Sequence, residues 1–204
     1  DLTAGLEYNR DNLKDDMWGY NRYTKQTVNI GSAFLQNEWK NEKWSILLGG
    51  RLDKHNLINH VIFSPRANLR FNPSEDINLR LSYSSGFRAP QAFDEDLHIE
   101  NVGGTVSMIE RAKNLKEEKS QSFSASADMY HRFGAFQVNF LVEGFYTRLS
   151  DVFVLENIGE RDGILIKERR NGSGAKVLGL SMEGKMAYLS LFQLQAGVTL
   201  QQSR

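Results

Sequence analysis

The 204-residue sequence contains no cysteine, which excludes disulfides, thiolate catalysis and metal sites built on cysteine. Its 25 basic side chains balance its 25 acidic ones, and this disfavours a nucleic-acid binder that relies on a strong positive field. No apolar run approaches the roughly 18 residues of a membrane helix. Hydropathy alone would therefore indicate a soluble protein. Transmembrane β-barrels escape that test, because their strands alternate apolar and polar residues.

Other signals are missing as well. No glycine-rich phosphate loop followed by Lys-Ser occurs, and no serine, histidine and aspartate stand in a recognisable nucleophile context. We therefore expect no enzyme and no intrinsic cofactor. The sequence has no initiator methionine or signal peptide, and both of its ends already have the pattern of strands. We expect residues 1–204 to be a single segment cut from a longer protein.

What the sequence does contain is period-two alternation, which places successive side chains on opposite faces of a strand. Residues 61–71, "VIFSPRANLRF", put apolar side chains on one face and polar, arginine-bearing ones on the other. After the turn signal "NPSED", residues 77–85, "INLRLSYSS", repeat the pattern. About ten such strands follow one another, without a convincing helix. The sequence predicts an all-β, antiparallel, up-and-down meander.

The lengths of strands and connections favour a membrane barrel. Strands near ten residues long match the ~9–11 residues that a tilted strand needs to cross a bilayer. Short connections alternate with long ones, as in outer-membrane barrels. The short ones are expected at 41–42, 72–76, 131–134 and 189–191, and the long or irregular ones at 11–26, 86–119 and 156–174. The alternative is a soluble all-β binding or structural protein, in which the polar face would be solvated.

An ordered set of motifs resembles one family, the TonB-dependent outer-membrane receptors. Ser64-Pro65-Arg66, Leu79-Arg80 and Ser82-Tyr83 precede the element Gly86, Phe87, Arg88, Ala89 and Pro90 in the expected order. Downstream, Asn114 and Leu115 begin "NLKEEKS", which is similar to an "N.LKPE.S" element of the family, with Glu117 where proline is usual. The resemblance runs from about residue 43 to the end.

The resemblance implies a 22-stranded transmembrane β-barrel in the outer membrane of a Gram-negative bacterium, with a plug domain and energy supplied by TonB. We expect the plug domain and the C-terminal strands to lie outside this chain. It also implies that Arg66, Arg80 and Glu143 line the lumen or touch the plug. The expected partners are TonB, through the plug segment, outer-membrane lipid and a small-molecule nutrient, but no nucleic acid.

The segment 86–119 would then be a ligand-facing outer loop. Its binding candidates are Phe93, Asp94, Glu95, Asp96, His98 and Glu100. The carboxylates and His98 could gather a cation, but a solvated acidic loop is the preferred interpretation, so no metal site is assigned. The most favoured transported ligand is a ferric siderophore. The alternative within the family is haem, with His98 as an axial ligand, because haem-uptake members carry such a histidine between the same two motifs.

Overall fold

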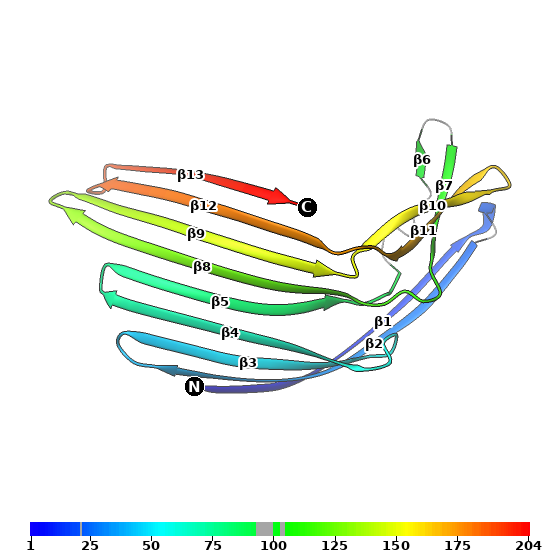
Figure 1. Ribbon diagram of the computed structural model, residues 1–204, viewed down its shortest axis with the longest axis horizontal. Coiled ribbons are helices and arrows are strands. Elements are labelled where there is room, and N and C mark those ends of the chain that lie inside the picture. Colours follow the sequence, from blue (N-terminus) through cyan, green and yellow to red (C-terminus); the bar gives the residue numbers. More distant parts are fainter. Residues whose placement is uncertain (21, 93–99, 103–104) are drawn as a thin grey trace.

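The computed structural model describes residues 1–20, 22–92, 100–102 and 105–204. Nine strands form one antiparallel sheet in the order β1-β2-β3-β4-β5-β8-β9-β12-β13 (Figure 1). These strands are β1 (Leu2–Met17), β2 (Arg22–Lys40), β3 (Trp44–His55), β4 (Val61–Ser74), β5 (Ile77–Arg88), β8 (Glu118–Phe133), β9 (Phe136–Ser150), β12 (Ala175–Tyr188) and β13 (Phe192–Ser203). The predicted antiparallel meander is confirmed.

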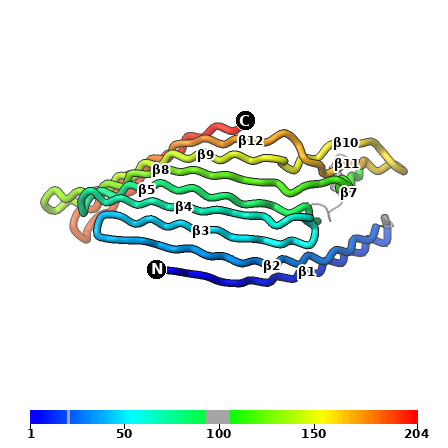
Figure 2. The backbone as a smooth tube through the Cα atoms, turned by 60° about the horizontal axis from the view of Figure 1, so that its bottom comes forward, coloured from blue at the N-terminus to red at the C-terminus, as the bar shows by residue number. Residues whose placement is uncertain are grey.

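The two ends of this sheet differ. The connections β2–β3, β4–β5, β8–β9 and β12–β13 are short and gather at one end, which we call the turn end (Figure 1). The opposite end, the loop end, carries the longer segments. The strands run side by side between the two ends (Figure 2). Each strand pairs with the next at nearly constant register, so every side chain has a defined face and a defined height along the sheet.

A second, four-stranded sheet lies at the loop end, in the order β10-β11-β7-β6 (Figure 1). Its strands are β10 (Phe153–Arg161), β11 (Ile164–Asn171), β7 (Thr105–Arg111) and β6 (Glu100–Val102). The irregular loops expected at 86–119 and 156–174 are therefore wrong in part, because each contributes strands to this sheet. β11 and β7 run parallel, so the pairing joins two segments that are far apart in the sequence and that no hairpin signal could reveal.

The irregular connection expected at 11–26 is also wrong. β1 and β2 pair continuously from Leu2–Asn37 to Met17–Arg22, and the link includes the short 3₁₀ turn η1 (Trp18–Tyr20). β2 pairs with β3 only as far as Ile30, so the remaining part of the hairpin projects beyond the sheet. This part is polar on both faces and therefore shows no alternation, although its backbone groups are paired.

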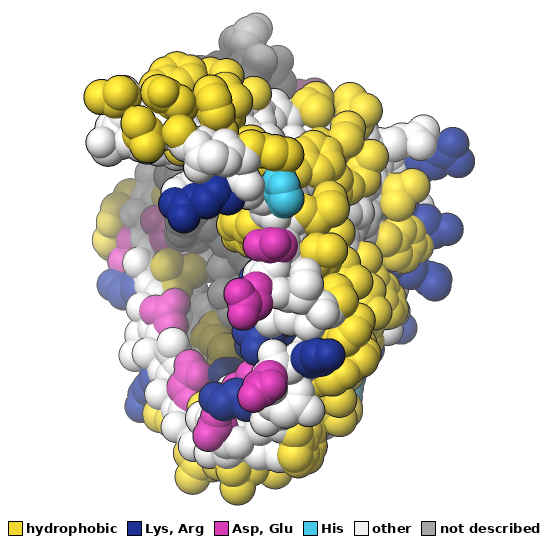
Figure 3. All heavy atoms as spheres, turned by 90° about the vertical axis from the view of Figure 1, so that its left-hand side faces the viewer, with side chains coloured by type: hydrophobic (Ala, Val, Ile, Leu, Met, Phe, Trp, Pro, Cys, Tyr) yellow, Lys and Arg dark blue, Asp and Glu magenta, His cyan; other side chains and the backbone are white. Residues whose placement is uncertain are grey.

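The main sheet has one apolar and one polar face. Exposed hydrophobic side chains occupy the apolar face, including Leu48, Leu81, Phe123 and Leu180. Seen from the turn end, hydrophobic side chains form the right-hand flank, and acidic and basic ones gather around the hollow (Figure 3). No helix within the described ranges is long and apolar enough to span a membrane. A sheet that leaves one whole face apolar requires a partner for that face.

Candidate functional site

The "GFRAP" motif ends a strand and closes the base of the long loop. β5 ends at Arg88, and Ala89 packs in a buried cluster with Ile58 and Ile62, against which Phe87 also packs. The amide of Gln91 donates to the carbonyl of Ala89 at 2.9 Å, so the chain turns sharply around Pro90. The motif therefore fixes the point at which the chain leaves the sheet.

The β3–β4 connection, residues 56–60, is tied down on two sides. The fully buried His55 accepts a hydrogen bond from the Leu57 amide at its Nδ1, at 3.0 Å. Asn56 continues the ladder along β2, because its side chain accepts from the Asn29 amide at 2.9 Å and donates to the Thr27 carbonyl at 2.8 Å. This connection therefore forms an ordered wall at the loop end.

Glu117, the residue at the usual proline position, links two segments. Its side chain is 8% exposed, and its Oε1 lies 3.1 Å from His60 Nε2 and 3.0 Å from Lys119 Nζ. Burial raises the pKa of the Glu117 carboxyl, but its own backbone amide, Lys119 and His60 together outweigh burial and hold the pKa below its usual value. His60 and Lys119 also line a cleft of about 360 Å³, which opens where β4 and β5 stop pairing.

Asn171 clamps the second long loop to the first. Its Nδ2 donates to the carbonyls of Lys116 at 3.1 Å and Asp151 at 2.7 Å, and its Oδ1 accepts from the Lys116 amide at 2.8 Å. The motif residues Asn114 and Leu115 precede this clamp, Asn114 exposed and Leu115 half-buried. The guanidinium of Arg88 lies 5.7 Å from the centre of the Phe153 ring. Both long segments are therefore joined at their bases.

The second sheet presents charged side chains above these bases. Arg170 pairs with Glu156 at 2.6 Å and with Glu168 at 2.7 Å, and Arg161 pairs with Glu110 at 3.0 Å. The pairs connect β10, β11 and β7 across the sheet. Such exposed ion pairs contribute little stability individually, but they keep the two long segments in one arrangement.

Most of the ligand-binding candidates predicted in segment 86–119 fall outside the residues that the structure describes. Phe93, Asp94, Glu95, Asp96 and His98 lie outside the described residues. Glu100 begins β6, and its side chain is also outside the description. Within the described part of the chain, no group of three or more acidic or histidine side chains is arranged to hold a metal ion.

Arg66, Arg80 and Glu143 lie on the polar face at defined heights. Arg80 is paired with Arg70 on one side and Ser126 on the other, and Ser126 is paired in turn with Glu143. The Nε of Arg80 donates to Asn78 Oδ1 at 2.7 Å. None of the three forms an ion pair in the described ranges.

A second polar group on the same face was missed by the sequence reasoning. Glu7, Ser32 and Asp53 lie in register on β1, β2 and β3. Arg51 donates to all three, at 2.9 Å, 2.8 Å and 2.7 Å respectively, and the Ser32 hydroxyl donates to Asp53 at 2.6 Å. Asp53 is 3% exposed. The signal was the pair of opposite charges two residues apart in "RLD", which alternation places on one face.

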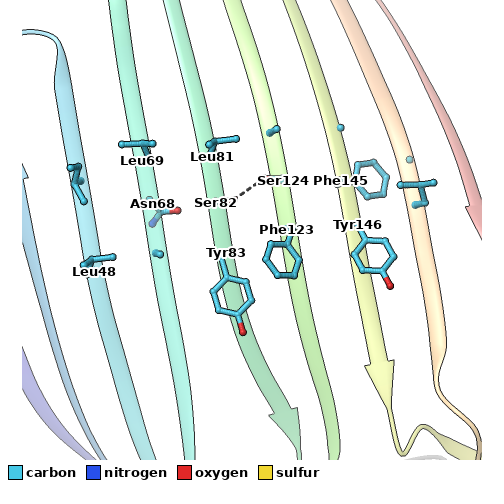
Figure 4. Close-up of a pocket in the computed structure, with 16 residues that line it drawn as sticks. Leu48, Asn68, Leu69, Leu81, Ser82, Tyr83, Phe123, Ser124, Phe145 and Tyr146 are labelled. Atoms are coloured by element: carbon cyan, nitrogen blue, oxygen red, sulfur yellow. Dashed lines mark hydrogen bonds between the residues drawn. The ribbon is translucent and has the colours of Figure 1, made fainter.

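On the apolar face, an aromatic row crosses the sheet. Tyr83, Phe123 and Tyr146 lie in register on β5, β8 and β9, and the first two rings are 4.7 Å apart (Figure 4). The two tyrosine hydroxyls point toward the loop end (Figure 4). Beside this row, small side chains leave a groove of about 710 Å³, lined almost wholly by apolar atoms. Tyrosines with this placement suit a lipid–water boundary.

Comparison with known proteins identifies the architecture. The model of the family described as "TonB dependent receptor-like, beta-barrel" matches residues 1–204. The chain belongs to this family. Barrels of TonB-dependent receptors lie in the outer membrane of Gram-negative bacteria and serve transport receptors. No curated protein matches the chain.

Solved structures of receptors share the fold. The siderophore receptor PirA from Pseudomonas aeruginosa is similar with a TM-score of 0.79 at 18% identity, over 98% of this chain and 39% of that one. The ferric enterobactin receptor PfeA, in complex with BCV-L6, gives 0.73 at 18% identity, over 98% and 33%. The FrpB iron transporter from Neisseria meningitidis (F5-1 variant) gives 0.72 at 16% identity, over 100% and 34%. This chain spans about 33–39% of the length of these three structures.

Proposed function

We propose that the protein containing this chain is an outer-membrane receptor that imports a ferric siderophore, with energy from TonB. The observation that carries the proposal is the loop end, where two long segments form one clamped sheet above a barrel wall. Similar structures belong to proteins named as siderophore and ferric enterobactin receptors, which supports this class of ligand. Iron would enter as cargo within the siderophore, rather than as a resident cofactor.

The candidate residues would take different roles according to their position between the loop end and the turn end of the sheet. Segment 86–119 would face the ligand, including His98 and its acidic neighbours. Arg66, Arg80 and Glu143 would line the lumen and contact a plug domain, because their charges have no ion-pair partner among the described residues. TonB would act through that plug, which we expect to lie outside residues 1–204.

Ligand titration of the full-length receptor tests the proposal. Purified protein is titrated with ferric siderophores and with haem, and quenching of tryptophan fluorescence reports binding. Saturable binding of a ferric siderophore, without saturable binding of haem, supports the proposal. Binding of haem that His98→Ala abolishes would instead establish the haem-uptake alternative. Saturable binding of neither ligand would refute both forms of iron uptake.

A further inference from the structure

Three basic residues lie side by side at the loop end of the apolar face. Arg148 on β9 is paired in register with Lys176 on β12. Lys176 and Arg204, which follows β13, exchange backbone hydrogen bonds of 2.8 Å and 2.9 Å. All three side chains are exposed. Since neighbouring strands are about 4.8 Å apart, the backbone positions of the three residues fall within a span of about 10 Å.

The strand period places this row on the apolar face and not in the hollow. Two residues toward the turn end, the same three strands carry Tyr146, Leu178 and Gln202, which are again in register. Leu178 is 57% exposed, and both Tyr146 and Leu178 line the apolar groove. The basic row therefore stands immediately above the aromatic row of Figure 4, on the side toward which the tyrosine hydroxyls point.

The row lacks neutralising carboxylates. None of its three side chains forms an ion pair with a carboxylate in the described ranges. Lys119 on β8 offers a contrast, because it points to the same flank but is bound to Glu117 at 3.0 Å. Like charges directly opposite one another destabilise a sheet. An anion that covers three adjacent cations at one height would therefore relieve their mutual repulsion.

The turn end has no such arrangement. At that end the β2–β3 connection places Glu42 next to Lys43, and the β4–β5 connection carries Glu75 and Asp76. Among the described residues, the row of adjacent basic side chains therefore lies at the loop-end rim of the apolar face. A cationic row next to an exposed hydrocarbon-like surface matches a molecule that has an anionic head and apolar tails.

We propose that Arg148, Lys176 and Arg204 bind the phosphate groups of a phosphorylated lipid, whose acyl chains lie along Tyr146, Leu178 and the groove beside them. Guanidinium groups hold phosphate by paired hydrogen bonds, and the lysine adds a third charge. This inference rests on the proposed location in an outer membrane, with the loop end at the outer leaflet. It is independent of which nutrient is imported.

The test measures lipid retention by the full-length receptor. Protein purified in a nonionic detergent is incubated with lipid A that carries both phosphates, with the same lipid after enzymatic dephosphorylation, or with inorganic phosphate. Bound lipid is counted by native mass spectrometry. The variant is Arg148→Gln/Lys176→Gln, and the matched control is Lys43→Gln/Lys113→Gln, which removes the same charge at exposed positions outside the strands.

The expected loss follows from the charges removed. Each basic residue near a membrane surface accounts for roughly a fivefold change in affinity, so the double variant should bind phosphorylated lipid about 25-fold more weakly. The control should bind like the unmodified receptor, and dephosphorylated lipid should be retained poorly by all forms. Equal retention of lipid A by the double variant, or equal retention of the dephosphorylated lipid, would overturn the proposal. Displacement of the lipid by millimolar inorganic phosphate would identify a site for free anions instead. Siderophore titration of the same double variant keeps the two proposals separate, since its nutrient binding should be unchanged.

Discussion

Replacing Leu81 by arginine should reveal which face of the sheet meets lipid. Leu81 is 54% exposed on the apolar face and lies four residues after Ile77 and seven before Arg88, the bounds of β5. A rise of about 3.3 Å per residue and a tilt of about 40° give roughly 2.5 Å of membrane depth per residue. Leu81 then lies about 10 Å from one end of β5 and about 18 Å from the other, inside an apolar band about 25 Å tall.

An arginine at that depth costs about 2–4 kcal/mol on the lipid face of a barrel. We therefore expect Leu81→Arg to shift the folding equilibrium on the order of a hundredfold toward the unfolded receptor. The matched control is Ser82→Arg, at the same depth on the opposite face. It loses the 2.7 Å hydrogen bond to Ser124, worth about 1 kcal/mol, but its guanidinium enters a polar environment.

Both variants of the full-length receptor are refolded into lipid vesicles across a urea series, and the folded fraction is read from its heat-modifiable mobility in gels. The midpoint for Leu81→Arg should fall well below that for Ser82→Arg. If the two variants lose the same stability, or if Ser82→Arg loses more, the assignment of the apolar face to lipid is incorrect.

Three further predictions concern the loop end and the polar face. Because the pKa of Glu117 is depressed, its tie to His60 should be complete above the ordinary glutamate pKa and disappear as the pH falls through the lower folded-state value. The protection of residues 56–60 against hydrogen exchange, corrected for the intrinsic pH dependence of exchange, should therefore fall on acidification, and Glu117→Gln should remove this change. Asn171→Ala should lower the local free energy of unfolding by about 2–3 kcal/mol, because it leaves the Lys116 amide and the carbonyls of Lys116 and Asp151 without their partner. Proteolysis within 151–174 should therefore become faster. An unchanged cleavage rate would show that the clamp is dispensable. Gly179→Leu should destabilise the barrel by about 1–3 kcal/mol, since a Cβ there would overlap the Phe145 ring. The additional change Phe145→Ala should restore much of the loss in a urea melt.

The main sheet, apart from the projecting part of the β1–β2 hairpin, could be predicted from the sequence because each of its strands carries its own signal. Alternation assigns a face to every side chain, and the turn residues fix the register of neighbouring hairpins, as they do for residues 61–74 and 77–88. The boundary at Arg88 also followed from the sequence, since Gly86 and Pro90 mark the end of the ladder.

The arrangement at the loop end could not be predicted in the same way. β7 and β11 are separated by more than 50 residues and run parallel, so no local pattern connects them. Asn171 and Glu117 act through partners on other segments, and only the folded chain brings those partners within hydrogen-bond distance. The group around Arg51 depends on three registers at once, although the alternation of "RLD" contains part of the signal.

The parallel pairing of β7 with β11 constrains how such a receptor can change during evolution. Surface-exposed loops usually vary in length independently of one another. Here a shift of one residue in either segment would move six paired positions, from Ile164–Val106 to Arg169–Arg111, out of register. Insertions should therefore accumulate at Asp162-Gly163, the tip of the β10–β11 hairpin, where both residues have positive φ values and the chain makes a two-residue turn. Variation in length would concentrate at that tip, while the paired strands beneath it change together.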